Sequence, residues 1–435
     1  MSIPPDDALS QRIGGLAREA EQAAGTGNHA HAVRSWQQLL ALSPGHPQAL
    51  TRLAQSQLAL GDRDAARESL RQALDAKPGH AMAHAVLARI HVAEGDSAGA
   101  IRELDMAIRH DPGAWGALFE KAQLLEAEGR AREAALCWST GLDTMPPDAR
   151  QAPHLQATLA HARAVTARNQ QQLRDFLDTR TADLRAQERK RDVERFEHCL
   201  DIVTGRRAFV TARPANLAMP ELPAIQFFHR EDFPWARRVE EAMPEVLAEL
   251  EAVSSGDRAG FEPYVQTRPG ETSAQFAPLD RNLAWGAYFL WKHGNRIDAH
   301  CERCPATVAA VEHAPMVHIR TRAPAVLFSE LQPGAHIPPH NGATNTRLTV
   351  HLPLIIPDNC AFRVGDDTRP WVPGELFIFD DTILHEAWNR SDQRRVVLIF
   401  DVWHPMLTML ERELVTRTVE GLVDFYDGAS ELGEL

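Results

Sequence analysis

Four side chains in the last third of the chain have the types and spacing of a metal site that also binds an acid. His340 and His385 stand at the ends of strand-like runs, in HIPPHNG and DDTILHEAW. Neutral imidazole is a common ligand of iron and other transition metals. Arg347 and Arg395 lie on β-rich runs nearby in sequence, and a buried guanidinium is costly unless it is paired with an anion. The set suits an Fe(II) site that holds a dicarboxylate co-substrate.

Residue alternation places the polar side chains of these runs on one face of each strand. In RLTVHLPL, Arg347, Thr349 and His351 share a face, because successive side chains of a strand point to opposite sides. The intervening apolar residues share the other face. In RRVVLIFDV, Arg395 alternates with apolar residues in the same way. The pattern predicts a small barrel whose outer sheet face is apolar and whose interior holds both arginines.

The usual third metal ligand is absent from the first motif. Non-haem Fe(II) oxygenases commonly offer two histidines and one carboxylate and leave three positions open. Gly342 stands two residues after His340, where the carboxylate is commonly found. Either solvent or a nearby carboxylate must fill that position. Asp381 and Glu386 are the carboxylates closest to His385 in sequence, and strand alternation points Glu386 away from it.

The first third of the chain repeats with a step of 34 residues, which is the period of the tetratricopeptide repeat, a helix–turn–helix unit. Small alanines let two helices approach closely, a glycine ends a helix where φ > 0 is allowed, and a proline closes the unit. We expect three clear repeats between about residues 28 and 146, with a degenerate helix before them and capping helices after. Four registers keep the step: Pro44, Pro78, Pro112 and Pro146; Gly27, Gly61, Gly95 and Gly129; Ala32, Ala66, Ala100 and Ala134; and Ala54, Ala88 and Ala122.

These elements predict a multidomain α and β protein. The repeat array with its capping helices is expected at residues 1–165 and a polar helical linker at 166–215. A proline-spaced stretch, ARPANLAMPELPAI, then marks the boundary. Residues 216–435 are expected to form a double-stranded β-helix (a jelly-roll, cupin-like fold), because β-rich runs alternate there with Gly, Pro, Asn and Asp turns.

Composition narrows the classes of partner. The formal charge of −13 argues against nonspecific binding to nucleic acid or an anionic membrane. No apolar run is long enough for a membrane span. Five cysteines in 435 residues fit a reducing compartment, so we expect a cytoplasmic protein. Because arrays of this kind present concave surfaces, the repeats are predicted to bind a peptide or partner protein; the alternative is a dimerisation or purely structural module.

Three motifs identify a family. LxPGxxIxPHxGxTNxRLxxHLPL, FxFDDTxxHEAWN and RVVLIFDVWHP resemble the aspartyl/asparaginyl β-hydroxylases, 2-oxoglutarate-dependent dioxygenases, and the resemblance covers Leu222–Pro405. Members of that family bind iron through two histidines only, with a glycine in place of the acid. The resemblance therefore implies Fe(II) at His340 and His385. Repeats ahead of the catalytic domain also resemble the animal members, which hydroxylate epidermal-growth-factor-like domains.

The same resemblance implies how the co-substrate 2-oxoglutarate binds. Ser329 and Arg395 should bind its distal carboxylate. Arg347 and His351 should contact its other end or neighbouring polar groups. An arginine fork pairs bidentately with a carboxylate, and a serine hydroxyl can donate a further hydrogen bond.

Three functions remain open from the sequence. The first is hydroxylation of an aspartyl or asparaginyl side chain in a peptide or protein, which the repeat groove helps to hold. The second is hydroxylation of a small molecule or a lipid acyl chain. The third is a non-catalytic adaptor with a degenerate barrel, against which the intact set of site residues argues.

Further chemistry-bearing residues have two interpretations each. Cys301 and Cys304 are either reduced thiols at a helix start, which we favour, or half of a zinc or redox site that lacks a second ligand pair. Asp380 and Asp381 either orient His385 or cap the turn after the FIF strand. Tryptophans are expected mainly in the barrel core, with a substrate role open for the first two: Trp285, Trp291, Trp371, Trp388 and Trp403.

Overall fold

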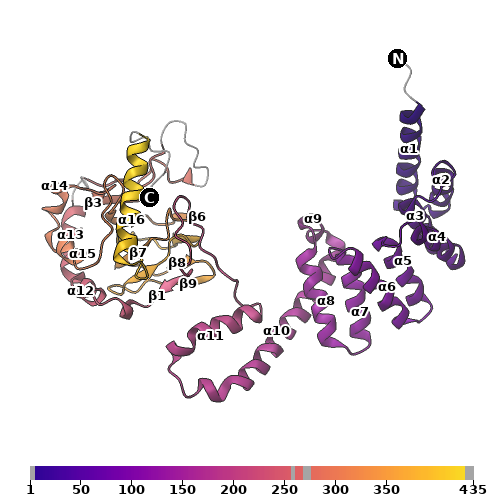
Figure 1. The fold of residues 1–435 in the computed structure, drawn as a ribbon, viewed down its shortest axis with the longest axis horizontal. Helices are drawn as coiled ribbons and strands as arrows, with labels where there is room; N and C mark the ends of the chain where they lie inside the picture. The colour runs from indigo at the N-terminus through magenta and orange to yellow at the C-terminus, as the bar shows by residue number, and fades with distance from the viewer. Residues whose placement is uncertain (1–4, 256–259, 268–275, 427–435) are drawn as a thin grey trace. The chain divides into compact units, whose positions relative to one another are not determined.

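The computed structural model describes residues 5–255, 260–267 and 276–426. It divides into two compact units, Met1–Gly205 and Arg206–Leu435. The first is helical, and the second is built mainly from antiparallel strands (Figure 1). The predicted class, a helical repeat array followed by a jelly-roll domain, is confirmed.

Within its described residues, the first unit contains four helical hairpins. Their alanines are fully buried at both helix–helix registers, which lets the helices of each pair approach closely. Asn28, Asp62 and Asp96 each cap the second helix of a hairpin by accepting a backbone N–H. The hairpins are α1 (Pro5–Gly25) with α2 (His29–Leu42), α3 (Pro47–Ala59) with α4 (Arg63–Ala76), α5 (Ala81–Ala93) with α6 (Ser97–His110), and α7 (Trp115–Ala127) with α8 (Ala131–Thr144).

The structure corrects one expectation about the array. We expected the helix before the repeats to be degenerate. Instead, α1 packs along α2 as the first helix of a complete hairpin. Its residue Ala20 is fully buried and stands 34 residues before Ala54. The glycine register behaves as expected: Gly27, for example, has φ = +79° at the turn between α1 and α2.

Capping and linking helices complete the first unit: α9 (Pro147–Arg150), η1 (Pro153–Leu155), α10 (Gln156–Arg185) and α11 (Lys190–Val203). The start of α10 closes the last repeat by burying Leu159 and Ala162 against Trp138. Further along α10, Arg174 forms ion pairs with carboxylates on its own helix and on α11, and these pairs hold the two helices together. The boundary between the two units falls in the chain between Gly205 and Arg206.

Two antiparallel sheets form the body of the second unit, and the pairings among its described residues leave both sheets open at their edges. The larger sheet has the order β1 (Phe227–Phe228), β10 (Phe377–Phe379), β7 (Arg347–Ile355), β12 (Arg395–Trp403), β5 (Val326–Leu331), β3 (Trp285–Lys292) and β2 (Glu262–Pro263), with β4 (Asn295–Arg296) paired to β3. The smaller has the order β6 (His336–His340), β11 (His385–Asn389), β8 (Cys360–Val364) and β9 (Asp367–Arg369).

Helices cover the outer face of the larger sheet. The apolar face of β7, with Leu348, Val350 and Leu352, packs against helical residues that include Val239 and Val246. Figure 1 shows α12 (Ala236–Glu241), α13 (Met243–Ser254), α14 (Asp298–Cys301) and α15 (Pro305–Val311) to one side of β7 and β8. The short 3₁₀ helix η2 (Arg230–Asp232) precedes them in the chain. A last helix, α16 (Met409–Phe425), begins with a capping box between Thr408 and Glu411. The opposite, polar face of β7 faces the space between the two sheets.

Candidate active site

A cavity of about 990 Å³ opens between the two sheets. Strands of both sheets line it, so side chains far apart in sequence meet there. All six residues that the sequence singles out for metal and co-substrate line this cavity: Ser329, His340, Arg347, His351, His385 and Arg395. The fold thus gathers the candidate chemistry in one place.

The two histidines face each other across a strand pair. His340 ends β6 and His385 begins β11, and the two are direct partners in the ladder. Their ring centroids lie 4.0 Å apart. Each Nδ1 lies at hydrogen-bond distance from a backbone carbonyl, that of Pro338 at 2.8 Å and that of Ile383 at 3.0 Å. Because a carbonyl only accepts, each Nδ1 carries the proton, which leaves the Nε2 lone pair of each ring available for a metal.

Burial keeps both rings neutral. Burial is the main reason that the pKa of His340 falls to about 3, and repulsion between the two rings, were both protonated, lowers it further. Burial likewise lowers the pKa of His385 to about 4. A neutral imidazole is the form that ligates a metal. The pair is therefore ready to bind a cation without first losing protons at neutral pH.

The carboxylate of Asp381 occupies the space where residue 342 would carry a side chain. A Cβ placed on Gly342 would lie 2.2 Å from Cγ and Oδ1 of Asp381, so any larger residue here requires the Asp381 carboxylate to move. Thr349 donates a hydrogen bond of 3.2 Å to Asp381 Oδ2, while Oδ1 is buried without a partner in the described part of the chain. Burial raises the pKa of Asp381 to about 6. Within the described residues, no group of three or more His, Cys, Asp or Glu side chains has the arrangement of a metal site.

The other two carboxylates near His385 have different partners. Asp380 accepts hydrogen bonds from the backbone N–H and the hydroxyl of Thr382, so it caps the turn after β10. Glu386 pairs with Arg363 at 2.5 Å and with His336 at 2.7 Å. Of the three, Asp381 is the one that lines the cavity.

Arg395 is a buried cation that faces the cavity. Its side chain is among the largest fully buried groups, with 1% of the residue exposed. Its Nε and Nη1 have no acceptor in the described part of the chain, and its guanidinium stacks on Trp371 at 4.7 Å from the ring centre. Burial lowers the pKa of Arg395 to about 10, which leaves it charged at neutral pH. Such a group calls for an anionic ligand.

The other two predicted co-substrate ligands, Arg347 and His351, differ in how far their polar atoms already have partners within the protein. Arg347 Nη1 donates to Asp401 Oδ2 at 3.2 Å, so part of its charge is neutralised within the protein. His351 packs among aromatic rings, among them Phe379 at 4.9 Å. Burial, and next the charge of Arg395, lowers the pKa of His351 well below its ordinary value. A neutral His351 can share a hydrogen bond with a ligand beside Arg395.

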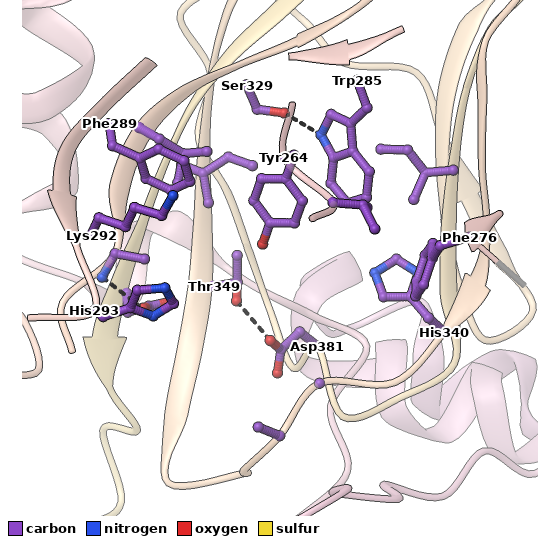
Figure 2. A pocket seen from close by; sticks show the side chains of 18 of the residues that line it. Tyr264, Phe276, Trp285, Phe289, Lys292, His293, Ser329, His340, Thr349 and Asp381 are labelled. Atoms are coloured by element: carbon purple, nitrogen blue, oxygen red, sulfur yellow. Dashed lines mark hydrogen bonds between the residues drawn. The ribbon is translucent and has the colours of Figure 1, made fainter. Parts of the chain in front are cut away.

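The sequence alone did not assign several residues of the cavity wall. Strand alternation placed Thr349 on the face of Arg347 without a role, and Asp401, six residues beyond Arg395, follows from the same alternation. Tyr264 and Phe276 stand in loops that give no periodic signal. Figure 2 shows these two rings with Trp285 and His340 around the cavity.

The paired cysteines take no part in this site. Cys301 and Cys304 are buried free thiols, and Cys301 Sγ contacts the carbonyl of Leu290 at 3.4 Å. Burial raises the pKa of Cys304 to about 12. Thiols of this kind are inert, because the thiolate is the reactive and metal-binding form.

Comparisons with known proteins match both units of the chain. Residues 240–405 match the family model described as aspartyl/asparaginyl beta-hydroxylase, and residues 18–81, 51–114 and 86–138 match a tetratricopeptide-repeat model. Among solved structures, the repeats are similar to a tetratricopeptide-repeat protein of Thermus thermophilus, with 20% identity over 37% of this chain and 89% of that chain and a TM-score of 0.31.

Curated relatives include different kinds of hydroxylase. Human aspartyl/asparaginyl beta-hydroxylase is 38% identical over 142 residues, which are 32% of this chain and 19% of that protein. The ornithine lipid ester-linked acyl 2-hydroxylase of Rhizobium tropici is 34% identical over 198 residues, 45% of this chain and 66% of that protein. The alignment with the human enzyme thus spans about a fifth of that protein's length. The chain carries a domain of the aspartyl/asparaginyl β-hydroxylase family behind tetratricopeptide repeats.

Proposed function

We propose that the chain is an Fe(II)- and 2-oxoglutarate-dependent dioxygenase that hydroxylates an aspartyl or asparaginyl side chain of a peptide or protein. The observation that carries the proposal is the buried guanidinium of Arg395, which has two nitrogens without an acceptor among the described residues and lies on the same cavity as the histidine pair. A dicarboxylate that reaches both features satisfies the arginine and brings its other end to the metal ligands.

The protein's part in binding 2-oxoglutarate follows from the donors around Arg395. The guanidinium would bind the distal carboxylate, with the hydroxyl of Ser329 as a second donor on the neighbouring strand. Neutral His351 would complete the polar contacts, and the aromatic wall would exclude water. These groups orient the co-substrate along the cavity.

His340 and His385 would hold the iron through their Nε2 atoms, because each Nδ1 is committed to a backbone carbonyl. Bound Fe(II) would supply the oxygen chemistry: of the two atoms of O₂, one would enter succinate as 2-oxoglutarate loses CO₂, and the other would enter a substrate C–H bond. The carboxylate of Asp381 fills the space beside Gly342, two residues after His340. Its carboxylate would accept hydrogen bonds from solvent that completes the metal's coordination.

The charge of the cavity favours an acidic substrate. Its described lining includes five cationic side chains, from Arg281, Lys292, Arg322, Arg347 and Arg395, and two carboxylates, from Asp381 and Asp401. Lys292 is paired with Glu262 and Arg347 with Asp401, so the positive charge of the bound metal would keep the site attractive to an anion beside a dianionic co-substrate. An aspartyl carboxylate is attracted to such a site. The repeats would contribute by holding a peptide that contains this residue.

A lipid substrate is the second candidate, because the Rhizobium tropici relative is named for hydroxylation of an acyl chain. The discriminating experiment incubates the full chain with Fe(II), 2-oxoglutarate and either Asp- and Asn-containing peptides or ester-linked ornithine lipid, followed by mass spectrometry. The proposal predicts one added oxygen on Asp or Asn and none on peptides in which alanine replaces them. Oxygen added to the acyl chain alone would contradict the peptide assignment.

A further inference from the structure

A tryptophan on the cavity wall is hydrogen-bonded to the predicted co-substrate ligand Ser329. The indole Nε1 of Trp285 donates to Ser329 Oγ at 3.1 Å, and Figure 2 shows this bond at the end of the cavity opposite Asp381. Both residues are buried, with 5% and 1% of their surfaces exposed. An indole N–H can only donate. The serine oxygen is therefore the acceptor, and its own proton must point elsewhere.

Strand register directs that proton toward the cavity. Trp285 on β3 and Arg395 on β12 are both direct partners of Leu331, from opposite sides of β5. Ser329 lies two residues along β5 on the same face, diagonal to both residues in the ladder. Its direct partners on the two neighbouring strands are an alanine and a valine, whose side chains offer no acceptor. Among the described residues, the Ser329 hydroxyl accepts from Trp285 and donates no hydrogen bond to the chain.

The indole itself is held in a fixed plane. Tyr264 stacks on it with ring centroids 4.0 Å apart and an interplanar angle of 17°. Phe276 and His340 flank it at 6.4 Å and 6.5 Å. Stacked and flanked in this way, the N–H keeps one direction, and the serine hydroxyl keeps the complementary one.

We propose that Trp285 is a positioning residue for the co-substrate: its indole fixes the Ser329 hydroxyl as a donor beside Arg395. The inference rests on the proposed function, because it assumes that 2-oxoglutarate binds here. A serine donor and an arginine fork together present only N–H and O–H groups to the ligand. They therefore favour an acceptor-only group, a carboxylate, over a carboxamide that would place its own N–H groups there.

The test is a double-mutant cycle on the full chain, with Trp285→Phe, Ser329→Ala and both together. The readouts are KM and kcat for Fe(II)-dependent conversion of 2-oxoglutarate to succinate, and calorimetric binding of 2-oxoglutarate in the presence of Zn(II). Losing an oriented hydrogen bond should raise KM and Kd about three- to tenfold in each single variant, with kcat within about twofold of wild type. The double variant should match Ser329→Ala, because Trp285 acts through the serine.

Trp291→Phe is the matched control, because Trp291 is also buried on β3 but packs in the core on the outer face of the sheet. It should leave KM unchanged. Thermal unfolding of every variant separates a loss of binding from a loss of fold. An unchanged KM in Trp285→Phe, or effects that multiply in the double variant, would overturn the inference alone. Wild-type protein that neither binds nor turns over 2-oxoglutarate would overturn the proposed function as well.

Discussion

Replacing Arg395 with methionine should make the ligand-free protein more stable and unable to bind its co-substrate. Burial lowers the pKa of Arg395 from 12.5 to about 10. At about 1.4 kcal/mol per pKa unit, keeping this group charged costs the folded state about 3 kcal/mol. The stacking of Arg395 on Trp371, worth about 1–2 kcal/mol, offsets part of that cost. Methionine fills similar space without charge, so the free energy of unfolding should rise by about 1–2 kcal/mol.

The assay is thermal unfolding of metal-free protein, with and without 2-oxoglutarate and a non-oxidising metal. For a unit of this size, the expected gain raises Tm by about 2–8 °C. Co-substrate at a hundred times its Kd should stabilise wild type by about 2.7 kcal/mol and should not stabilise the variant. Arg394→Met is the control on the adjacent residue, because Arg394 pairs with fully buried Glu330 at 3.2 Å. That change should instead cost about 1–3 kcal/mol.

Two results would refute the reasoning. If Arg395→Met lowers Tm as Arg394→Met does, Arg395 has a partner in the free protein and is structural. If the variant still gains stability from 2-oxoglutarate, the co-substrate does not use this arginine. Either outcome would remove the observation on which the functional proposal rests.

Three further changes have definite expected results. Gly342→Asp should lower Tm and weaken metal binding measured by calorimetry, because the new Cβ would lie 2.2 Å from the Asp381 carboxylate. Adding Asp381→Gly should restore Tm; if it does not, the clash lies elsewhere. His404 accepts the Met406 N–H at Nδ1, and burial lowers the pKa of His404 to about 4. Its unfolded form takes up a proton near pH 6.5 before the folded form does, so stability should fall as pH drops from about 6.5 to 4, by up to about 3 kcal/mol. In metal-free protein, His404→Asn should flatten that slope in urea titrations, and an unchanged slope would assign it to other groups. Removing residues 1–205 should reduce peptide turnover while 2-oxoglutarate oxidation without peptide continues; equal peptide turnover would exclude a substrate role for the repeats.

The parts of the structure that follow a period were predictable. A step of 34 residues located the helical hairpins, and alternation in RLTVHLPL separated the cavity face of β7 from its apolar face. The helix before the repeats was expected only as a degenerate one, because the proline register begins at Pro44, although Ala20 continues the register of Ala54. Alternation along β12 also predicts that Asp401 lies on the same face as Arg395.

Contacts set by loops and by three-dimensional register were not predictable. Nothing in the order of residues shows that Asp381 fills the space beside Gly342, since the two belong to different loops. The stacking of Tyr264 on Trp285 joins a loop to a strand. The sequence suggested Trp285 chiefly as core, whereas the structure places it on the cavity wall with its N–H on Ser329.

The central claim is that one cavity joins a two-histidine iron site to an arginine that binds 2-oxoglutarate. Its most direct test is Fe(II)-dependent conversion of 2-oxoglutarate to succinate by the purified full chain without added substrate, beside His340→Ala and Arg395→Ala. The account predicts slow turnover in wild type that both variants abolish. No conversion, together with no detectable binding of metal or 2-oxoglutarate, would contradict it.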